Sequence, residues 1–141
     1  MAKKTNYKKK CDEEWKRIIR SIGYCEMCGR KGIRGRTKGW TNLHAHHIIG
    51  RASSCYRHDL SNGLCLCARC HKWTPISPHV DKNAFLRWLE KNRRGQYLWY
   101  MNNTIEVKKE ICGEVVITRK PKQPSCKMNY KRIYELLKRV D

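Results

Sequence analysis

Apolar residues recur at helical spacing in the first part of the chain, at positions i, i+3, i+4 and i+7: Trp15, Ile18, Ile19 and Ile22. This period places them on one face of an α-helix, where they form a core face. The acidic run from Asp12 to Glu14 predicts the first turn of that helix, and Gly23 predicts its end. Residues 1–10 precede it as a basic arm.

Shorter patterns in the middle of the chain predict a hairpin followed by a helix. Alternation from Asn42 to Ile49 indicates a strand, Leu64 to Cys67 a short return strand, and Ala68 to Trp73 the opening of a helix. After two prolines that break the chain, Asp81 to Arg94 reads as another helix, and Gly95 is the expected stop.

The last third of the chain carries weaker signals. Tyr97 to Met101 predicts a short helix, Val115 to Thr118 a strand and Lys120 to Pro124 a linker. Asn129 is positioned to cap a final helix whose apolar face would contain Tyr130, Ile133, Tyr134 and Leu137. We therefore predict an α+β protein: a basic arm over residues 1–10, one domain over 11–119 with its core motif at 24–73, and a linker with a basic helix over 120–141.

The charge balance points to a polyanionic partner. Lysine and arginine number 32 against 12 acidic residues, so the net charge is +20 over 141 residues. Such an excess attracts nucleic acid. The start of the chain has no apolar stretch typical of a signal peptide, and the longest apolar run, Tyr97 to Met101, is too short to span a bilayer. We expect a cytoplasmic protein with no membrane partner.

Two Cys-x-x-Cys motifs predict a structural zinc site. Cys25 and Cys28 form one pair and Cys67 and Cys70 the other. Four thiolates close a tetrahedral coordination sphere and leave no position for a substrate. Binding energies of such sites, about 10–16 kcal/mol, rival the stability of a small domain. Cys65 lies on the same side of the strand as Cys67 and stays open as an alternative ligand.

Histidines surround the second cysteine pair. His46 and His47 are adjacent on the predicted strand, so their side chains point to opposite faces and should have different roles. His71 directly follows Cys70. His44 shares a strand face with His46, and His79 could reach the same place from the proline-rich turn. For both, packing or surface exposure is the simpler interpretation.

The segments L-H-A-H-H-I-I-G-R and D-L-S-N-G-L-C-L-C-A-R-C-H-K resemble the HNH nuclease family, in its zinc-knuckle branch common in phage genomes. The resemblance covers residues 24–72. It implies a ββα-metal core with a four-cysteine zinc site and additional helices around it. Carried over by motif, His46 and His71 bind a catalytic divalent ion, His47 is the general base, and Asn62 ties down the loop.

The resemblance also implies the reaction, which is metal-dependent hydrolysis of DNA phosphodiester bonds by nicking or by double-strand cleavage. A histidine ligand makes Mn²⁺, Ni²⁺ or Co²⁺ plausible beside Mg²⁺. Phage origin would place the protein in a bacterial host cell, with packaging or recombination proteins as partners. The expected DNA contacts are Arg51, Arg57, Arg34, Arg36 and Lys38.

The sequence leaves two other classes of protein open and argues against a third. A non-catalytic, zinc-dependent nucleic-acid-binding module fits the charge and the cysteines equally well. A module with two structural zinc ions would use the histidines around the second ion: His46, His47, His71 and His79. A zinc deaminase needs a glutamate next to its histidine ligand, and the sequence contains no H-x-E.

Overall fold

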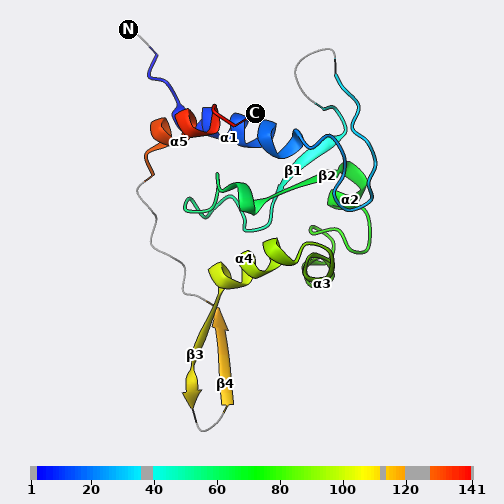
Figure 1. Cartoon of the computed structure of the whole chain (residues 1–141), viewed down its shortest axis with the longest axis vertical. Coiled ribbons are helices and arrows are strands. Elements are labelled where there is room, and N and C mark those ends of the chain that lie inside the picture. The colour runs from blue at the N-terminus through cyan, green and yellow to red at the C-terminus, as the bar shows by residue number, and fades with distance from the viewer. Residues whose placement is uncertain (1–2, 36–39, 112–113, 120–127, 141) are drawn as a thin grey trace.

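The computed structural model describes residues 3–35, 40–111, 114–119 and 128–140. Figure 1 shows the chain as three stacked groups of elements, with a two-stranded hairpin projecting away from them. In chain order the elements are α1 (Tyr7–Arg20), β1 (Leu43–His47), the short 3₁₀ helix η1 (Leu60–Asn62), β2 (Gly63–Cys67), α2 (Ala68–Lys72), α3 (Lys82–Asn92), α4 (Arg94–Thr104), β3 (Ile105–Ile111), β4 (Glu114–Arg119) and α5 (Tyr130–Leu137).

The central group is an antiparallel hairpin with a helix at its end. β1 pairs with β2 in a register that sets Leu43 opposite Cys67 and His47 opposite Gly63. α2 begins at the residue after β2. The predicted α+β class and its strand–strand–helix core are therefore confirmed, with further helices around the core (Figure 1).

Helix α1 begins earlier than the sequence pattern indicated. The side chain of Asn6 caps the helix by accepting a hydrogen bond from the backbone N–H of Lys9 at 3.1 Å. The acidic run from Asp12 to Glu14 consequently lies in the second turn, so its assignment to the first turn was wrong. Lys8, Lys9 and Lys10 of the predicted basic arm belong to α1. The cap formed by Asn6 therefore sets the start of α1, although acidic residues such as Asp12 are preferred in the first turn of a helix.

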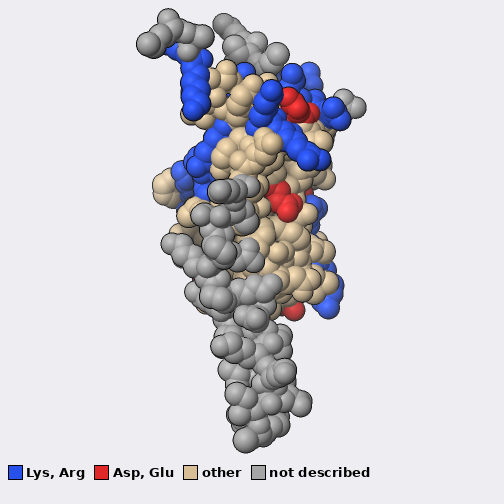
Figure 2. Space-filling view, turned by 90° about the vertical axis from the view of Figure 1, so that its left-hand side faces the viewer, with Lys and Arg blue, Asp and Glu red and all other residues tan. Residues whose placement is uncertain are grey.

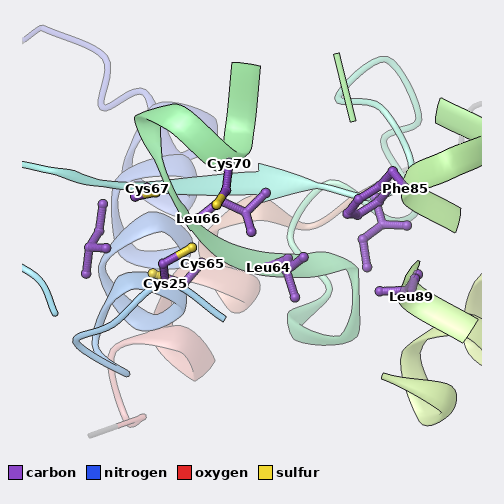
Figure 3. Packing of buried hydrophobic residues seen from close by; sticks show 10 residues of the cluster. Cys25, Leu64, Cys65, Leu66, Cys67, Cys70, Phe85 and Leu89 are labelled. Atoms are coloured by element: carbon purple, nitrogen blue, oxygen red, sulfur yellow. The ribbon is translucent and has the colours of Figure 1, made fainter. Parts of the chain in front are cut away.

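The core lies between the hairpin and the helices on either side of it. Every residue of β2 is buried, and Leu64 and Leu66 belong to one hydrophobic cluster with Phe85 and Leu89 of α3; in Figure 3, Leu64 lies on the side nearer to α3. On the other side, α1 approaches β2 closely at Gly63. A β-carbon on Gly63 would lie 2.1 Å from Cδ1 of Ile19, so any larger residue at this position would require the Ile19 side chain to move.

A second, smaller cluster joins the two ends of the chain. Cys11 and Trp15 of α1 are fully buried and pack with Leu137 of α5. The side chain of Asn129 accepts a hydrogen bond from the N–H of Arg132, which confirms the predicted cap of this last helix. α1 and α5 therefore lie side by side (Figure 1).

The region after α2 differs from the prediction at one glycine. α3 has the side chain of Asp81 as its N-terminal cap, but it ends at Asn92 with Arg93 as its C-cap, and Gly95 lies inside the next helix, α4. Gly95 as a helix stop was therefore wrong. The side chain of Gln96 in α4 donates to the carbonyl oxygen of Gly63 at 2.8 Å, which holds α4 against the start of β2.

The strand predicted at 115–118 is present as β4, and it pairs with β3, which the sequence analysis had not predicted. The predicted linker from Lys120 to Pro124 lies outside the described residues.

Candidate active site

The four cysteines of the two Cys-x-x-Cys motifs come together. Their sulfur atoms lie within 4.8 Å of one another, with Cys67 at the end of β2 and Cys70 in α2. The Sγ atoms of Cys28 and Cys67 are 3.8 Å apart. A tetrahedral site with Zn–S bonds of about 2.3 Å requires sulfur separations of about 3.8 Å. The arrangement fits a structural zinc ion.

The backbone of the first motif is shaped for this site. Gly29 has φ = 75°, and its N–H donates to the carbonyl oxygen of Cys25 at 2.8 Å, which closes a tight turn around the two thiols. The N–H of Glu26 donates to the carbonyl oxygen of Cys65, and the N–H of Cys65 donates to the Glu26 carboxylate, both at 2.8 Å. These bonds attach the turn to β2.

Among the described residues, Cys65 does not join the four-sulfur group. Its side chain is fully buried in the hydrophobic core. Burial, with the charge of Glu26 close by, raises the pKa of the Cys65 thiol to about 12. The geometry therefore leaves Cys65 as a buried neutral thiol rather than a fifth candidate ligand.

Three histidines form a second group beside the first. They are His46 of β1, His71 of α2 and His79 in the turn before α3, and one nitrogen of each lies within 4.8 Å of the others. Nε2 of His71 is 3.2 Å from Nδ1 of His46 and 3.0 Å from Nε2 of His79. Nitrogen ligands at about 2.1 Å from one ion would be separated by about 3.0–3.4 Å. The three rings therefore fit a shared divalent cation.

The electrostatic state of this group favours metal binding. Burial, with the neighbouring histidines, lowers the pKa of His46 to about 3 and that of His71 to about 4. Both imidazoles are thus neutral at neutral pH, and a neutral imidazole has the lone pair that a metal requires.

His44 lies behind the metal-facing side of His71. Nδ1 of His44 is 3.0 Å from Nδ1 of His71, whereas the other nitrogen of His71 faces His46 and His79. Such a hydrogen bond fixes the tautomer and the ring orientation of a ligating histidine. The structure therefore places His44 as a partner of His71 rather than within the three-histidine group.

His47 occupies a different environment from its neighbour His46. Its ring stacks on the indole of Trp15 with centroids 3.9 Å apart and an angle of 11° between the planes. Nε2 lies 2.9 Å from the carbonyl oxygen of Arg57. Because a carbonyl oxygen only accepts hydrogen bonds, Nε2 of His47 carries the proton, and Nδ1 has the free lone pair. Burial, together with the positive charges of Arg51 and Arg57, lowers the pKa of His47.

Asn62 is fully buried at the end of the long loop that follows β1. Its Oδ1 accepts from the N–H of Ile49 at 2.6 Å, and its Nδ2 donates to the carbonyl oxygens of Ile49 at 2.9 Å and Tyr56 at 3.0 Å. These three bonds hold two points of the loop, Ile49 near its start and Tyr56 in its second half, against the residue that precedes β2.

The predicted DNA-contacting residues have different surroundings. The guanidinium of Arg57 is bound to the Asp12 carboxylate at 2.7 and 2.8 Å, so it is engaged inside the protein. Arg51 is more exposed, with one nitrogen 3.9 Å from the same carboxylate. Arg34 lies over the ring of Trp40 at 5.5 Å. Arg36 and Lys38 lie outside the described residues.

The sequence analysis left open whether His79 reaches the histidine site, with packing or surface exposure as the simpler interpretation, and it treated Asp12 and Trp15 only as parts of a helix. The structure brings His79 into the group with His46 and His71. His79 lies eight positions after His71, a spacing that matches no common ligand motif, so the sequence could not decide between the two interpretations. The contacts of Asp12 and Trp15 with the loop after β1 join segments more than thirty residues apart, and no local pattern reports them.

A two-stranded hairpin followed by a helix, with a four-sulfur group and a histidine group at their junction, defines a ββα-metal core with a zinc knuckle. Residues 25–73 match the family model described as HNH endonuclease, and this match confirms the resemblance found in the sequence. Members of this family generally are nucleases that act on DNA, so the match indicates a nuclease or nucleic-acid-binding function. No curated protein and no solved structure matches the chain. Within the described residues, no helix is both long enough and apolar enough to cross a membrane.

Proposed function

We propose that this protein is a metal-dependent DNA endonuclease in which His47 is the general base. The observation that supports this best is the state of the His47 ring. Its Nε2 is held by the Arg57 carbonyl at 2.9 Å, which leaves Nδ1 as a proton acceptor on a residue adjacent to His46. A histidine in this tautomer, beside a group of metal-binding histidines, has the features of a base that activates water.

His46, His71 and His79 would hold the catalytic cation, with Mg²⁺, Mn²⁺, Ni²⁺ and Co²⁺ as the candidates. Such an ion, when bound, neutralises charge on the phosphate and on the departing oxygen. Three protein ligands leave coordination positions open, as catalysis requires. Cys25, Cys28, Cys67 and Cys70 would hold zinc for a purely structural purpose.

The chain's own contribution to the reaction is proton transfer and orientation. Nδ1 of His47 removes a proton from a water molecule, whose oxygen attacks phosphorus while the bond from phosphorus to the 3′ oxygen breaks. The products are a 5′-phosphate and a 3′-hydroxyl, with the leaving oxygen protonated from solvent. The Arg57 carbonyl accepts a stronger hydrogen bond once the imidazole is positively charged, which stabilises the protonated base.

The rival candidate is a zinc-dependent nucleic-acid-binding module without catalysis. The charge and the cysteine site support it equally, because both functions need phosphate contacts and a stable core. The held tautomer of His47 favours the enzyme, since a binding module has no use for a directed proton acceptor. Association with phage packaging or recombination proteins, location in a bacterial cytoplasm and the division at residues 10 and 120 stay predictions.

The substitution His47→Ala tests the proposal. Cleavage of supercoiled plasmid at saturating Mg²⁺ or Mn²⁺ should slow by about 10²–10⁴-fold, the usual contribution of a positioned base. Circular dichroism, zinc content and duplex binding should stay at wild-type values, because the ring contacts neither the cysteines nor an exposed basic surface. Cleavage at the wild-type rate would contradict the role of His47. Tight DNA binding by wild-type protein with no cleavage in any of the four metals would favour the binding module.

A further inference from the structure

Two helices outside the HNH-matched segment hold the loop on which His47 depends. The Arg57 carbonyl that accepts the His47 proton lies in the long loop between β1 and η1. Three consecutive loop residues, Arg57, His58 and Asp59, are each contacted by α1 through Asp12 or Trp15. The loop that orients the proposed base is thus attached to the N-terminal helix.

Asp12 makes the polar half of this attachment. Its carboxylate accepts from Nε and Nη2 of Arg57 at 2.8 and 2.7 Å, and from Nε2 of His58 at 2.7 Å. Burial opposes ionisation of Asp12, but the hydrogen bonds from both partners and the positive charge of Arg57 lower its pKa to about 2. The carboxylate is therefore ionised, and its hydrogen bonds are of the strong, charge-assisted kind.

His58 is held in one orientation by the same contact. It is buried, and burial lowers its pKa, so the neutral ring donates its Nε2 proton to Asp12. Its Nδ1 is buried without a hydrogen-bond partner among the described residues. A buried N–H with no acceptor would be costly, so this nitrogen has a lone pair rather than a proton. The His58 ring packs almost perpendicular to the ring of Tyr130 in α5, with centroids 5.8 Å apart and an angle of 88° between the planes.

Trp15 makes the apolar half of the attachment. It lies three residues after Asp12, so both side chains project from the same side of α1. Its indole is fully buried, covers the face of the His47 ring at 3.9 Å, and donates its Nε1 proton to the carbonyl oxygen of Asp59 at 2.9 Å. One side chain thus contacts both the base and the loop.

We propose that Asp12 and Trp15 are positioning residues of the His47 base. Trp15 sets the plane of the imidazole, and Asp12 sets the place of the carbonyl that selects its tautomer. α5 supports this arrangement through Tyr130. The ring of Tyr130 contacts His58, and the carbonyl oxygen of Tyr130 accepts a hydrogen bond from the Cys11 thiol at 3.1 Å. The inference rests on the proposed function, since it assigns α1 a role in the same reaction.

The variants Asp12→Asn and Trp15→Phe test the inference, with Glu14→Gln as the matched control. Glu14 pairs with Arg17 on the same helix at 2.8 Å. In plasmid cleavage at saturating metal, Asp12→Asn and Trp15→Phe should lower kcat by about 10–100-fold, the typical effect of losing an outer-shell partner. KM for DNA and the zinc content should be unchanged, and Glu14→Gln should match wild type. Wild-type kcat in both test variants would overturn the inference.

A double-mutant cycle separates positioning from a general loss of structure. If Asp12 and Trp15 act through His47, their substitutions should change the residual rate of His47→Ala by less than about twofold. A merely structural effect would lower the rate equally in both backgrounds, and that result would overturn the inference.

A spectroscopic measurement does not depend on cleavage at all. In zinc-loaded protein with ¹⁵N-labelled histidine, the His47 resonance should show a proton on Nε2 that exchanges slowly with solvent. Asp12→Asn should give mixed tautomers and fast exchange, whereas Glu14→Gln should not. If the wild-type protein cleaves no DNA, the proposed nuclease function fails. If Asp12→Asn nevertheless changes the His47 tautomer and exchange rate, the positioning contact stands. If the His47 tautomer and exchange rate are unchanged in both test variants, the positioning inference is overturned. If Asp12→Asn does not fold, the same measurement is made on Trp15→Phe alone.

Discussion

The two ring nitrogens of His71 have different partners and therefore different roles in the candidate site. Nε2 faces His46 and His79, as a ligand would, while Nδ1 contacts His44. His47 shows a similar division, with one nitrogen bound by a carbonyl oxygen and the other available for chemistry. In each ring, the hydrogen bond at one nitrogen determines what the other nitrogen can do.

At this scale, His79→Ala tests the third ligand. Loss of a direct ligand should cost at least as much as loss of an outer-shell partner, so the Mn²⁺ concentration for half-maximal cleavage should rise by about tenfold or more. Mn²⁺ binding followed by calorimetry should weaken in parallel. Asn83→Ala, an exposed change on the next helix, is the control. An unchanged metal requirement would remove His79 from the site.

The sequence indicated His46 and His71 through their offsets from the cysteines, but it indicated His79 only as a residue that could reach the site from the proline-rich turn. The difference is physical, because the turn that carries His79 is shaped by a buried serine. Ser77 accepts from the N–H of Thr74 at 2.8 Å and donates to the carbonyl oxygen of Arg69 at 3.3 Å. These bonds fold the chain back over α2, and no periodic pattern reports such a turn.

At the scale of elements, the hairpin β1–β2 has strands of only five residues each. A hairpin of this size is marginally stable alone. The cysteine group joins the turn at residues 25–28 to the end of β2 and to α2. A zinc ion there would hold three elements together at one point, and the histidines of β1 and α2 would depend on it for their relative position.

Chelation of zinc should therefore unfold the central region, and Cys70→Ser should do the same, because thiolates provide all four ligands. The measurements are zinc per chain and far-ultraviolet circular dichroism. Cys65→Ala is the matched control: it removes a buried thiol next to the site but no member of the four-sulfur group, so one zinc per chain should remain. Loss of zinc in Cys65→Ala with retention in Cys70→Ser would reverse the ligand assignment.

At the scale of the described molecule, one group of basic side chains lies at the end that contains α1 and α5, which we call the basic end. Figure 2 shows Lys and Arg side chains over the part of the molecule that contains α1 and α5. The exposed basic residues of these two helices and of the two positions that follow α5 are Lys8, Lys9, Lys10, Lys16, Arg17, Lys131, Arg132, Lys138 and Arg139. α1 also carries the side chains that contact the His47 loop, so the basic end and the candidate site share one helix.

Binding to duplex DNA should accordingly depend strongly on salt. If about six phosphates are neutralised, affinity should fall by about 10³-fold between 50 and 200 mM salt. Fluorescence anisotropy with His47→Ala protein measures binding without cleavage. Replacement of Lys131 and Lys138 by glutamine should reduce the slope by up to about 2, whereas Glu135→Gln on the same helix should not reduce it. A flat salt titration would remove nucleic acid as the main partner.

The sequence by itself determined the features that depend on residues close together in the chain. Helical periodicity located the apolar faces of α1 and α5, and the spacing of the cysteines predicted the zinc knuckle, because a turn or a helical repeat is a local property. Tertiary structure alone decided how distant residues meet. Trp15 reaches His47 and Asp12 reaches Arg57 because α1 packs against the hairpin, with Ile19 of α1 close to Gly63 of β2. Close approach between segments far apart in sequence depends on the packing of the whole molecule, and no local pattern encodes it.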